Sequence, residues 1–495
     1  MTSSDSKRRL IIVSNRLPVG IKRMAEGQYD FSPSSGGLVT GLSGLAKGGV
    51  EFLWYGWPGI EVPQEDMSHL KEELLHKHNA VPVLLDQKTA DHYYDGYSNS
   101  TIWPLFHYQL DKVLFNEDTS AAYRKANQAF ADAIAPSLGH GDHVWVHDYH
   151  LMLLPLLLRQ QAWKMNISVH LGWFLHTPFP ETDFFTILPS KTEILDGILG
   201  ADVVGFQTDE ARRHFLSTCS QVLGRSSIDA KILCSGRQVV VGTYPIGVEP
   251  SEFHSRLQKD CVQSAIRAMR DNFRGAKIIV GVDRLDYIKG VPQKLYAFDR
   301  FLETHPEWVG VAILVQVAVP SRAHLEAHQE LKAEIQKLVG EINGKYGKVN
   351  YVPVHFLYSS IDPDELTALY AVADVCFISS IRDGMNLVCS EFVACHDQKA
   401  IQSSHESISH GTLILSRFTG AASSLDGSLV VNPWDQEECA EALAHAVSID
   451  ADEAHERMRK LGDKVEEQTS AHWGASFLCA LERVGKVEVL DMEFG

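Results

Sequence analysis

The hydrophobic pattern of the chain alternates between short apolar runs and longer amphipathic segments. A run of roughly four to eight apolar residues bounded by turn residues is typical of a buried strand, whereas a 3.6-residue repeat is typical of a helix. The runs predict strands over residues 10–13, 143–147, 169–175, 203–206, 239–241, 277–282, 311–317, 351–357, 375–379 and 412–415. Helices are predicted over residues 151–161, 192–199, 210–223, 292–302, 325–342, 366–373, 437–447, 454–461 and 472–484. This alternation predicts an α/β fold with doubly wound parallel sheets.

A cluster of proline and glycine at residues 244–250 interrupts the alternation, which then begins again. Such clusters stiffen and expose the chain, and they often mark the limits of domains. We therefore expect an N-terminal domain of residues 1–247 and a C-terminal domain of residues 248–469. The last helix, about residues 470–495, is expected to return to the first domain.

Polar and charged residues stand directly after several of the predicted strands. Arg16, Asp148 and His176 follow three strands of the first half, while Arg284 and Arg322 follow two strands of the second half. Because the carboxyl ends of parallel strands share one edge of a sheet, we expect the residues of each half to converge there.

Arg284 and Lys289 lie five residues apart in a loop between a predicted strand and a helix with Pro292 in its first turn. A helix N-terminus adds unpaired N–H groups and about half a positive charge. The combination suits a phosphate or diphosphate, held as a ligand or released as a leaving group; the alternative is two surface cations on a loop. Asp283 and Asp286 are interpreted as structural carboxylates that hold the loop and orient Arg284.

Two further glycine-bearing turns precede predicted helices. Residues 382–391 follow a strand, and if the helix begins at Leu387, Glu391 can reach a ribose while the first-turn N–H groups face a phosphate. The other turn ends at Gly36 and Gly37 and follows the first strand. A glycine turn on its own is as often only a turn.

Two other patterns carry chemistry less clearly. The aromatic residues at 93–94 and within 103–108 could stack on a sugar ring, although a buried core is the expected fate of most of that cluster. Asp362 and Asp364 have the spacing of a D-x-D metal motif, but an aspartate before proline at a helix start favours N-capping. The segment 405–410 is one residue too long for a zinc-binding H-E-x-x-H helix and is expected to be a loop.

Composition and charge narrow the classes of function. The 495 residues carry a formal net charge of −18, which argues against a nucleic-acid-binding surface. The eight cysteines form no C-x-x-C pair, and the first nine residues contain no apolar segment of the signal-peptide kind. A run of about 18 apolar residues, as a membrane helix would need, is absent from the sequence. We expect a cytoplasmic protein that contacts neither nucleic acid nor membrane.

Five motifs in order closely resemble the alpha,alpha-trehalose-phosphate synthase family, glycosyltransferase family 20. They are Ser-Asn-Arg-Leu-Pro-Val at 14–19, His-Asp-Tyr-His-Leu at 147–151, Phe-Leu-His-Thr-Pro-Phe-Pro at 174–180, Asp-Arg-Leu-Asp-Tyr-Ile-Lys-Gly at 283–290 and Arg-Asp-Gly-Met-Asn-Leu-Val at 382–388. The resemblance runs from about residue 10 to residue 484. It implies a GT-B fold, in which two Rossmann-like domains face a central cleft, and a retaining transfer of glucose from UDP-glucose to glucose 6-phosphate.

The resemblance also implies roles for individual residues. The donor, UDP-glucose, would be bound by Gly37, Arg284, Lys289, Ile361, Asp383, Gly384, Met385, Asn386, Leu387, Val388 and Glu391. The acceptor, glucose 6-phosphate, would be bound by Arg16, Tyr94, Trp103, Asp148 and Arg322. The residues implied at the reacting centre are Arg284, Lys289, Asp148, His176 and Asp383.

The resemblance implies no cofactor and no metal, because UDP-glucose is a co-substrate and the two cations of the diphosphate loop would supply the positive charge. A homo-oligomer or a complex with other trehalose-pathway subunits stays open. The alternatives are another GT-B transferase, making sucrose phosphate or glycogen, and a regulatory subunit without turnover. The cations Arg16 and Arg322 speak against glycogen synthesis. The presence of Arg284, Lys289 and Asp383, together with Glu391, speaks against a regulatory subunit.

Overall fold

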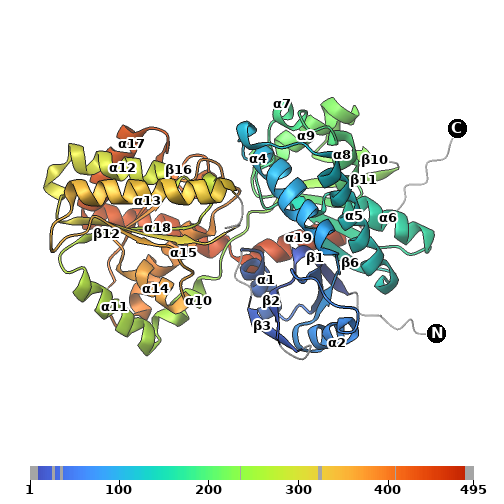
Figure 1. Ribbon diagram of the computed structural model, residues 1–495, viewed down its shortest axis with the longest axis horizontal. Coiled ribbons are helices and arrows are strands. Elements are labelled where there is room, and N and C mark those ends of the chain that lie inside the picture. Colours follow the sequence, from blue (N-terminus) through green and yellow to red (C-terminus); the bar gives the residue numbers. More distant parts are fainter. Residues whose placement is uncertain are drawn as a thin grey trace. The chain divides into compact units, whose positions relative to one another are not determined.

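A computed structural model describes residues 9–24, 28–33, 37–234, 236–321, 326–406 and 408–484. The chain divides into two compact units. Unit 1 contains the residues up to Pro245 and those from Ser470 onward, and unit 2 contains Ile246–Thr469 (Figure 1). The described helices do not include a segment with the length and hydropathy that a bilayer crossing requires.

The described part of unit 1 is built on a nine-stranded sheet. Its strands are β1 (Leu10–Arg16), β4 (Phe52–Trp57), β5 (Ala80–Pro82), β6 (His143–His147), β7 (His170–Phe174), β8 (Val203–Phe206), β9 (Ser227–Ile228), β10 (Lys231–Cys234) and β11 (Arg237–Thr243). The order is β5-β4-β1-β6-β7-β8-β11-β10-β9, and only the β11-β10-β9 end is antiparallel. A separate antiparallel hairpin pairs β2 (Val19–Arg23) with β3 (Tyr29–Pro33).

Helices of unit 1 cover both faces of this sheet. They are α1 (Gly37–Lys47), α2 (Met67–His78), α3 (Gln87–Asp91), α4 (Trp103–Phe106), α5 (Glu117–Ile134), α6 (Leu154–Lys164), α7 (Thr182–Phe185), α8 (Lys191–Ile198), α9 (Asp209–Leu223) and α19 (Ser470–Val484), with a π-helix η2 (His92–Ile102) and 3₁₀ turns η3 (Leu110–Lys112), η4 (Ala135–Ser137) and η5 (Tyr149–Leu151). Side chains of Asn116 and Thr208 cap the N-termini of α5 and α9. Helix α6 contacts α5 and β7, whereas α19 contacts α1, β7 and β8 (Figure 1).

Helix α19 completes the core of unit 1 from the far end of the sequence. Its Phe477 is fully buried and stacks on Trp145 of β6, with ring centroids 4.3 Å apart and an interplanar angle of 6°. The sheet makes room for this ring by glycine: a Cβ on Gly172 would lie 2.6 Å from the Phe477 ring, and one on Gly205 would lie 2.8 Å from it. The hydrophobic residues of this helix therefore belong to the sheet of unit 1.

Unit 2 contains a parallel sheet of six strands among its described residues. They are β12 (Lys277–Arg284), β13 (Ala312–Val319), β14 (Val354–Leu357), β15 (Val375–Ile378), β16 (Thr412–Ser416) and β17 (Leu429–Val431), in the order β14-β13-β12-β15-β16-β17. Its helices are α10 (Pro250–Leu257), α11 (Asp260–Asn272), α12 (Val291–Thr304), α13 (Glu326–Tyr346), α14 (Pro363–Val372), α15 (Leu387–His396), α16 (Gln398–Ser403), α17 (Gln436–Ser448) and α18 (Ala451–Glu467), with 3₁₀ turns η6 (Tyr287–Lys289), η7 (Pro306–Trp308) and η8 (Gly420–Ser423). In Figure 1, α12, α13 and α17 lie on one side of this sheet, and α11 and α14 lie on the other.

The predicted fold class, α/β with two Rossmann-like units of the GT-B kind, is confirmed. Some boundaries were wrong. The helix predicted over 151–161 begins at Leu154, because a 3₁₀ turn occupies Tyr149–Leu151 and Pro155 then stands in the first helical turn. The strand predicted from residue 351 begins at Val354, since Tyr351 pairs with Lys348 in an isolated bridge.

Candidate functional site

In unit 2 the strand order reverses between β12 and β15, which are neighbours in the sheet. Ligands of doubly wound folds bind beyond the carboxyl ends of the strands at such a switch point. Arg284 is the last residue of β12 and has an exposed side chain, and Lys289 lies in the η6 turn of the same loop. Residues 379–386 leave the end of β15 and lead into α15. Apart from Ile361, which follows β14, the sequence-predicted donor residues of unit 2 therefore start from adjacent strands.

A short ion pair joins the two loops at this edge. Lys289 Nζ donates to Asp383 Oδ2 at 2.5 Å, and both side chains are largely buried. Ser380 Oγ and Asn386 Nδ2 donate to the same oxygen at 3.2 and 3.1 Å, while the N–H of Gly384 donates to Asp383 Oδ1 at 3.0 Å. The carboxylate of Asp383 is thus held by several donors, and it fixes the ammonium of Lys289 at the strand ends.

The loop around Lys289 is tied to the strand-end loop by its backbone. Ser379 Oγ donates to the carbonyls of Lys289 and Gly290, at 3.2 and 2.8 Å, and the N–H of Ile381 donates to the carbonyl of Ile288 at 2.8 Å. Gly290 has φ +63, and a Cβ there would lie 2.0 Å from the carbonyl oxygen of Ser379. Only glycine fits this close approach with that backbone conformation.

Helix α15 begins at the same edge with its N-terminus. Asn386 precedes the helix with φ +67, a conformation that is uncommon for a residue other than glycine. The backbone of Leu387 and Val388 forms the first turn, whose N–H groups attract anions. One turn further, Glu391 accepts a 3.0 Å hydrogen bond from the hydroxyl of Tyr370, and burial raises the pKa of the Glu391 carboxyl.

The D-x-D pattern belongs to a helix cap. Asp362 precedes α14, and its Oδ1 accepts from the N–H of Asp364 at 2.8 Å, while the carboxylate of Asp364 pairs with Lys259 at 2.9 Å. The predicted N-cap is confirmed. Ile361, the predicted uracil contact, lies in the loop directly before this cap and is partly exposed.

In unit 1 a cation stands at the end of β1. The guanidinium of Arg16 lies 4.8 Å from the ring centroid of Trp57, the β4 residue that is paired with it in the sheet. Gly59, two residues after Trp57, has φ +82 and also packs against Arg16. A Cβ on this glycine would lie 2.0 Å from Nη2 of Arg16. Although the side chain keeps an exposed edge, burial lowers the pKa of the Arg16 guanidinium below its ordinary value. No carboxylate of the described residues lies within ion-pair distance of this guanidinium, so the charge is oriented but not neutralised by them.

Aromatic rings line the same part of unit 1. Tyr94 lies on the π-helix η2, and Trp103 begins α4 directly after it. The Tyr94 ring stacks on His150 at 5.7 Å and 13°, and it is partly exposed. As expected, most of the surrounding aromatic cluster is core, for Tyr93 and Phe106 are fully buried. Trp103 is also buried, with a 5% exposed fraction.

Asp148 is held in a strained conformation after β6. Its φ of 74° and ψ of 174° fall in a region that is almost restricted to glycine, and residues in such regions cluster at functional sites. The N–H of His176, beyond the end of β7, donates to Asp148 Oδ1 at 3.2 Å. Strands β1, β6 and β7 are adjacent and parallel. The expected convergence of Arg16, Asp148 and His176 at one sheet edge is therefore confirmed.

The imidazole of His176 is linked to two other side chains. Its Nε2 lies 3.1 Å from His147 Nδ1, and its Nδ1 lies 3.5 Å from Gln207 Nε2. Burial lowers the pKa of His176 to about 3 and also lowers the pKa of His147, so both rings are neutral near pH 7. Because the protein engages both ring nitrogens of His176, a sugar hydroxyl at either nitrogen would have to replace one of these contacts.

The remaining predictions concern Gly37, Gly36 and Arg322. Gly37 is the exposed first residue of α1. Arg322 and Gly36 lie outside the described residues. Sequence reasoning missed Trp57, Gly59 and His147, although Trp57 also stands at a strand end and could have been found by that rule.

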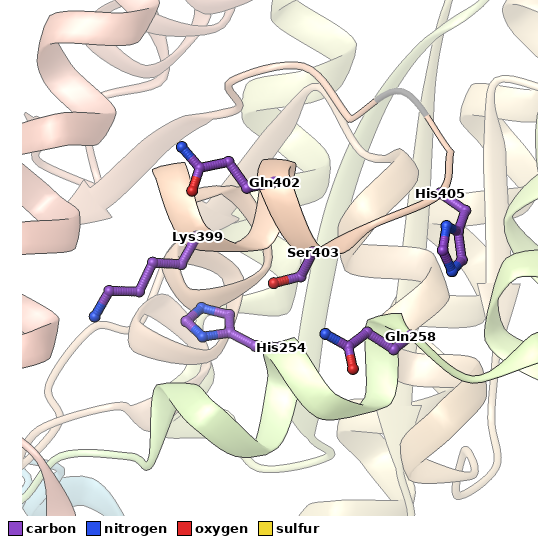
Figure 2. A pocket seen from close by; sticks show the side chains of 6 residues that line it. All are labelled: His254, Gln258, Lys399, Gln402, Ser403 and His405. Carbon is purple, nitrogen blue, oxygen red and sulfur yellow. The ribbon is translucent and has the colours of Figure 1, made fainter.

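A polar hollow of about 680 Å³ lies elsewhere in unit 2. It is lined by His254, Gln258, Lys399, Gln402, Ser403 and His405, from α10, α16 and the segment after α16 (Figure 2). Beside it, His254, Asp397 and Glu466 offer ligand atoms within 4.8 Å of one another, a spacing that a metal ion could use. These side chains already have protein partners: His254 lies 3.1 Å from Asp397, and Lys399 pairs with Glu466 at 2.9 Å. The hollow contains none of the sequence-predicted site residues.

The strand-end residues of unit 2 and those of unit 1 differ in what they can bind. In unit 2, two cations and a helix N-terminus surround the switch point, which suits a diphosphate, and the Glu391 carboxylate lies one turn further along the helix for a ribose. In unit 1, the guanidinium of Arg16, which has no carboxylate partner among the described residues, the partly exposed Tyr94 ring and the carboxylate of Asp148 suit a phosphorylated sugar. The two groups of residues therefore suit different anionic ligands.

Comparison with known proteins shows the family of the chain. A family model described as Glycosyltransferase family 20 matches residues 8–483. A relative from Emericella nidulans, named Alpha,alpha-trehalose-phosphate synthase [UDP-forming], is 49% identical over 484 residues, which cover 98% of this chain and 94% of the relative. A solved alpha,alpha-trehalose-phosphate synthase (UDP-forming) from Burkholderia xenovorans in complex with glucose-6-phosphate matches with a TM-score of 0.84 and 30% identity, over 96% of this chain and 100% of that one. A solved E. coli structure, described as bound with UDP-2-fluoro glucose, matches with a TM-score of 0.84 and 31% identity, over 96% of this chain and 99% of that one.

Proposed function

The chain belongs to glycosyltransferase family 20, and from this premise we propose that it transfers glucose from UDP-glucose to glucose 6-phosphate, giving alpha,alpha-trehalose 6-phosphate and UDP. The observation that carries the proposal is the arrangement at the switch point of unit 2. Arg284, the Lys289–Asp383 pair and the N-terminus of α15 all meet at the carboxyl ends of adjacent strands. The names of the relative and of the two solved structures support the same substrates.

In the proposed donor site, Arg284 and Lys289 hold the diphosphate of UDP-glucose. Asp383 then exchanges part of its bond with Lys289 for hydroxyls of the donor glucose, and the N–H groups at residues 385–388 face the phosphates. Glu391, oriented by the hydroxyl of Tyr370, accepts from the ribose.

The reaction breaks the bond between the anomeric carbon of glucose and the diphosphate oxygen. A bond forms from the same face to the anomeric hydroxyl oxygen of glucose 6-phosphate, and the proton of that hydroxyl passes to the departing diphosphate. Negative charge on the diphosphate grows as its bond breaks. Arg284 and Lys289 would stabilise that charge in the transition state, which is the usual contribution of oriented cations to catalysis.

In the proposed acceptor site, Arg16 binds the phosphate of glucose 6-phosphate, while Tyr94, Trp103 and Asp148 bind the sugar. The oriented guanidinium of Arg16, which has no carboxylate partner among the described residues, supports this role. His176 holds Asp148 through its backbone N–H, and its side chain is proposed to lie near the donor glucose.

We also propose that the transfer needs no metal ion. Arg284 and Lys289 supply the positive charge, while Asp362 and Asp364 are engaged in a helix cap and an ion pair. Dialysis against EDTA should leave the rate of UDP release unchanged. Loss of activity that added Mg²⁺ or Mn²⁺ restores would contradict this proposal.

The proposed setting is the cytoplasm, where the eight cysteines, all free thiols in this structure, would stay reduced. The decisive test of the function is an assay of UDP release from UDP-glucose, run with and without glucose 6-phosphate. We expect fast release only with glucose 6-phosphate, together with the appearance of a nonreducing disaccharide phosphate. UDP release at the same rate without the acceptor, or none with it, would refute the proposed transfer.

A further inference from the structure

A charged cluster lies buried in unit 2 below the loop that carries Arg284 and Lys289. Lys294 Nζ, on α12, donates to Asp283 Oδ2, near the end of β12, at 2.8 Å; the exposed fractions of the two side chains are 0% and 1%. Gln316 of β13 donates through Nε2 to the same oxygen at 3.1 Å. The cluster thus links two neighbouring strands to the helix that follows the loop.

The sheet leaves space for this cluster by having a glycine in β12. A Cβ on Gly281 would lie 2.3 Å from Nζ of Lys294 and 2.4 Å from Oε1 of Gln316. Asp283 Oδ1 and Gln316 Oε1 have no hydrogen-bond partner among the described residues. The buried pair is therefore incompletely satisfied, and an apolar pair of similar volume would be at least as stable. Stability alone does not account for these charges.

The position of the ion pair gives a better reason for the buried charges of Asp283 and Lys294 than stability does. Asp283 immediately precedes Arg284, and Lys294 lies one turn into the helix that begins after Gly290. The N–H of Lys294 also donates to the carbonyl of Gly290 at 3.0 Å. The ion pair therefore joins the two ends of the loop, and the segment between them carries both cations of the proposed donor site.

We propose that Asp283, Lys294 and Gln316 are positioning residues for the donor diphosphate: they fix the ends of the loop so that Arg284 and Lys289 meet the leaving group in one geometry. The inference rests on the proposed function of this site. Oriented charges stabilise a transition state only when they are held within about 0.5 Å of the productive geometry. A relaxed loop should therefore lower kcat and weaken UDP binding, without changing the acceptor site in unit 1.

The test variant is Asp283→Leu combined with Lys294→Met, which removes both charges and keeps the branching of the Asp283 side chain and nearly the volume of the Lys294 side chain. We expect a urea unfolding midpoint close to that of the unchanged protein, a kcat lowered at least tenfold, UDP binding weakened about tenfold by calorimetry, and an unchanged KM for glucose 6-phosphate. The matched control is Lys277→Met at the opposite end of the same strand, where Lys277 pairs with Asp374 at 2.8 Å. The control should leave kcat and UDP binding unchanged.

The outcomes separate the inference from the proposed function. If the unchanged protein transfers no glucose, the proposed function fails, whatever the variants do. If it is active and the folded double variant has the same kcat and UDP affinity, the positioning role is refuted. Where the double variant does not fold, the single variant Gln316→Met tests the proposal instead. It removes one hydrogen bond to Asp283 and leaves the ion pair in place. We expect a two- to tenfold lower kcat from it, and an unchanged kcat would overturn the proposal.

Discussion

Replacing Gly59 by alanine should displace the guanidinium of Arg16, the proposed phosphate-binding cation of unit 1, although the substitution itself removes no polar group. The new Cβ would lie 2.0 Å from Nη2 and 2.1 Å from Cζ of Arg16. The guanidinium would have to retreat by roughly 1.4 Å to regain ordinary van der Waals distance. Trp57 lies against the guanidinium at 4.8 Å and limits the directions in which it can move.

The size of the effect follows from the hydrogen bonds that the displaced guanidinium would lose. A charge-assisted bond of about 2.8 Å that lengthens by more than 1 Å is no longer a hydrogen bond. Losing one such bond costs about 1.5–3 kcal/mol, which corresponds to a KM for glucose 6-phosphate that is roughly 10- to 100-fold higher. The KM for UDP-glucose should stay unchanged, because the residues proposed to bind the diphosphate and the ribose belong to unit 2.

The assay is UDP release at saturating UDP-glucose with glucose 6-phosphate varied. Gly49→Ala is the matched control, since Gly49 also has a positive φ, +81, and a Cβ there would meet nothing within 4 Å. Both variants carry the backbone strain of alanine in a left-handed conformation, about 1–2 kcal/mol, but only Gly59→Ala displaces Arg16. A KM for glucose 6-phosphate that is the same in both variants would refute the role of Arg16 in phosphate binding.

Three other variants test the donor site and the buried ring system. Arg284→Ala should lower kcat by roughly 10²- to 10³-fold, as the loss of one oriented donor to a growing negative charge does; steady-state kinetics with a normal kcat would exclude the leaving-group role. Burial raises the pKa of Glu391, so the folded protein holds that proton more tightly than the unfolded chain, and ionisation above the unfolded pKa destabilises the fold. Glu391→Gln should therefore raise the urea midpoint at pH 7 while weakening UDP-glucose binding by about 1.5–3 kcal/mol in calorimetry; unchanged affinity would remove Glu391 from the ribose. Burial lowers the pKa of His176 to about 3, below its unfolded value of about 6.5, so its contribution to stability is complete above pH 6.5 and declines as the pH falls. The urea midpoint should therefore decrease as the pH is lowered from about 7.5 to about 5. The decrease should be less steep in His176→Asn, where His147 still contributes a decrease of the same sign. Equal slopes for the two proteins would show that His176 is not buried as a neutral ring.

The strand ends were the part of the site that the sequence could predict. An apolar run that stops at a charged residue is a local feature, so Arg16, Asp148 and His176 could be assigned to strand ends before their strands were known to be neighbours. The convergence then followed from the parallel order of β1, β6 and β7. In the same way, the Gly290 turn and the start of α15 were visible as glycine-bearing loops.

Contacts made across the sheet could not be predicted in this way. Trp57 and Gly59 surround Arg16 because β4 pairs with β1 in one register, and no local pattern specifies that register. Tyr370 reaches Glu391 because α14 packs against α15, and no local pattern specifies how these two helices pack. The π-helix that carries Tyr94 was also missed, because its apolar spacing fits neither a strand nor an α-helix.

Asp148 shows what a sequence does not reveal about a candidate site. Its residue type and place were predicted, but its backbone conformation, with φ 74° and ψ 174°, has no sequence pattern when the residue is not glycine. The segment at the end of β7 holds it there, since the N–H of Asp148 donates to the carbonyl of Phe174 and the N–H of His176 donates to Asp148 Oδ1. Strain of this kind is a property of the assembled sheet.

The return of α19 to unit 1 has a consequence for the order in which the protein is made. Synthesis proceeds from the N-terminus, and domains generally fold as units as they emerge. Every residue of unit 2 has been made by Thr469, whereas the sheet of unit 1 still lacks Trp473 and Phe477, which fill its core. The unit whose synthesis begins first is therefore expected to complete its core last, after every residue of the other unit has been made.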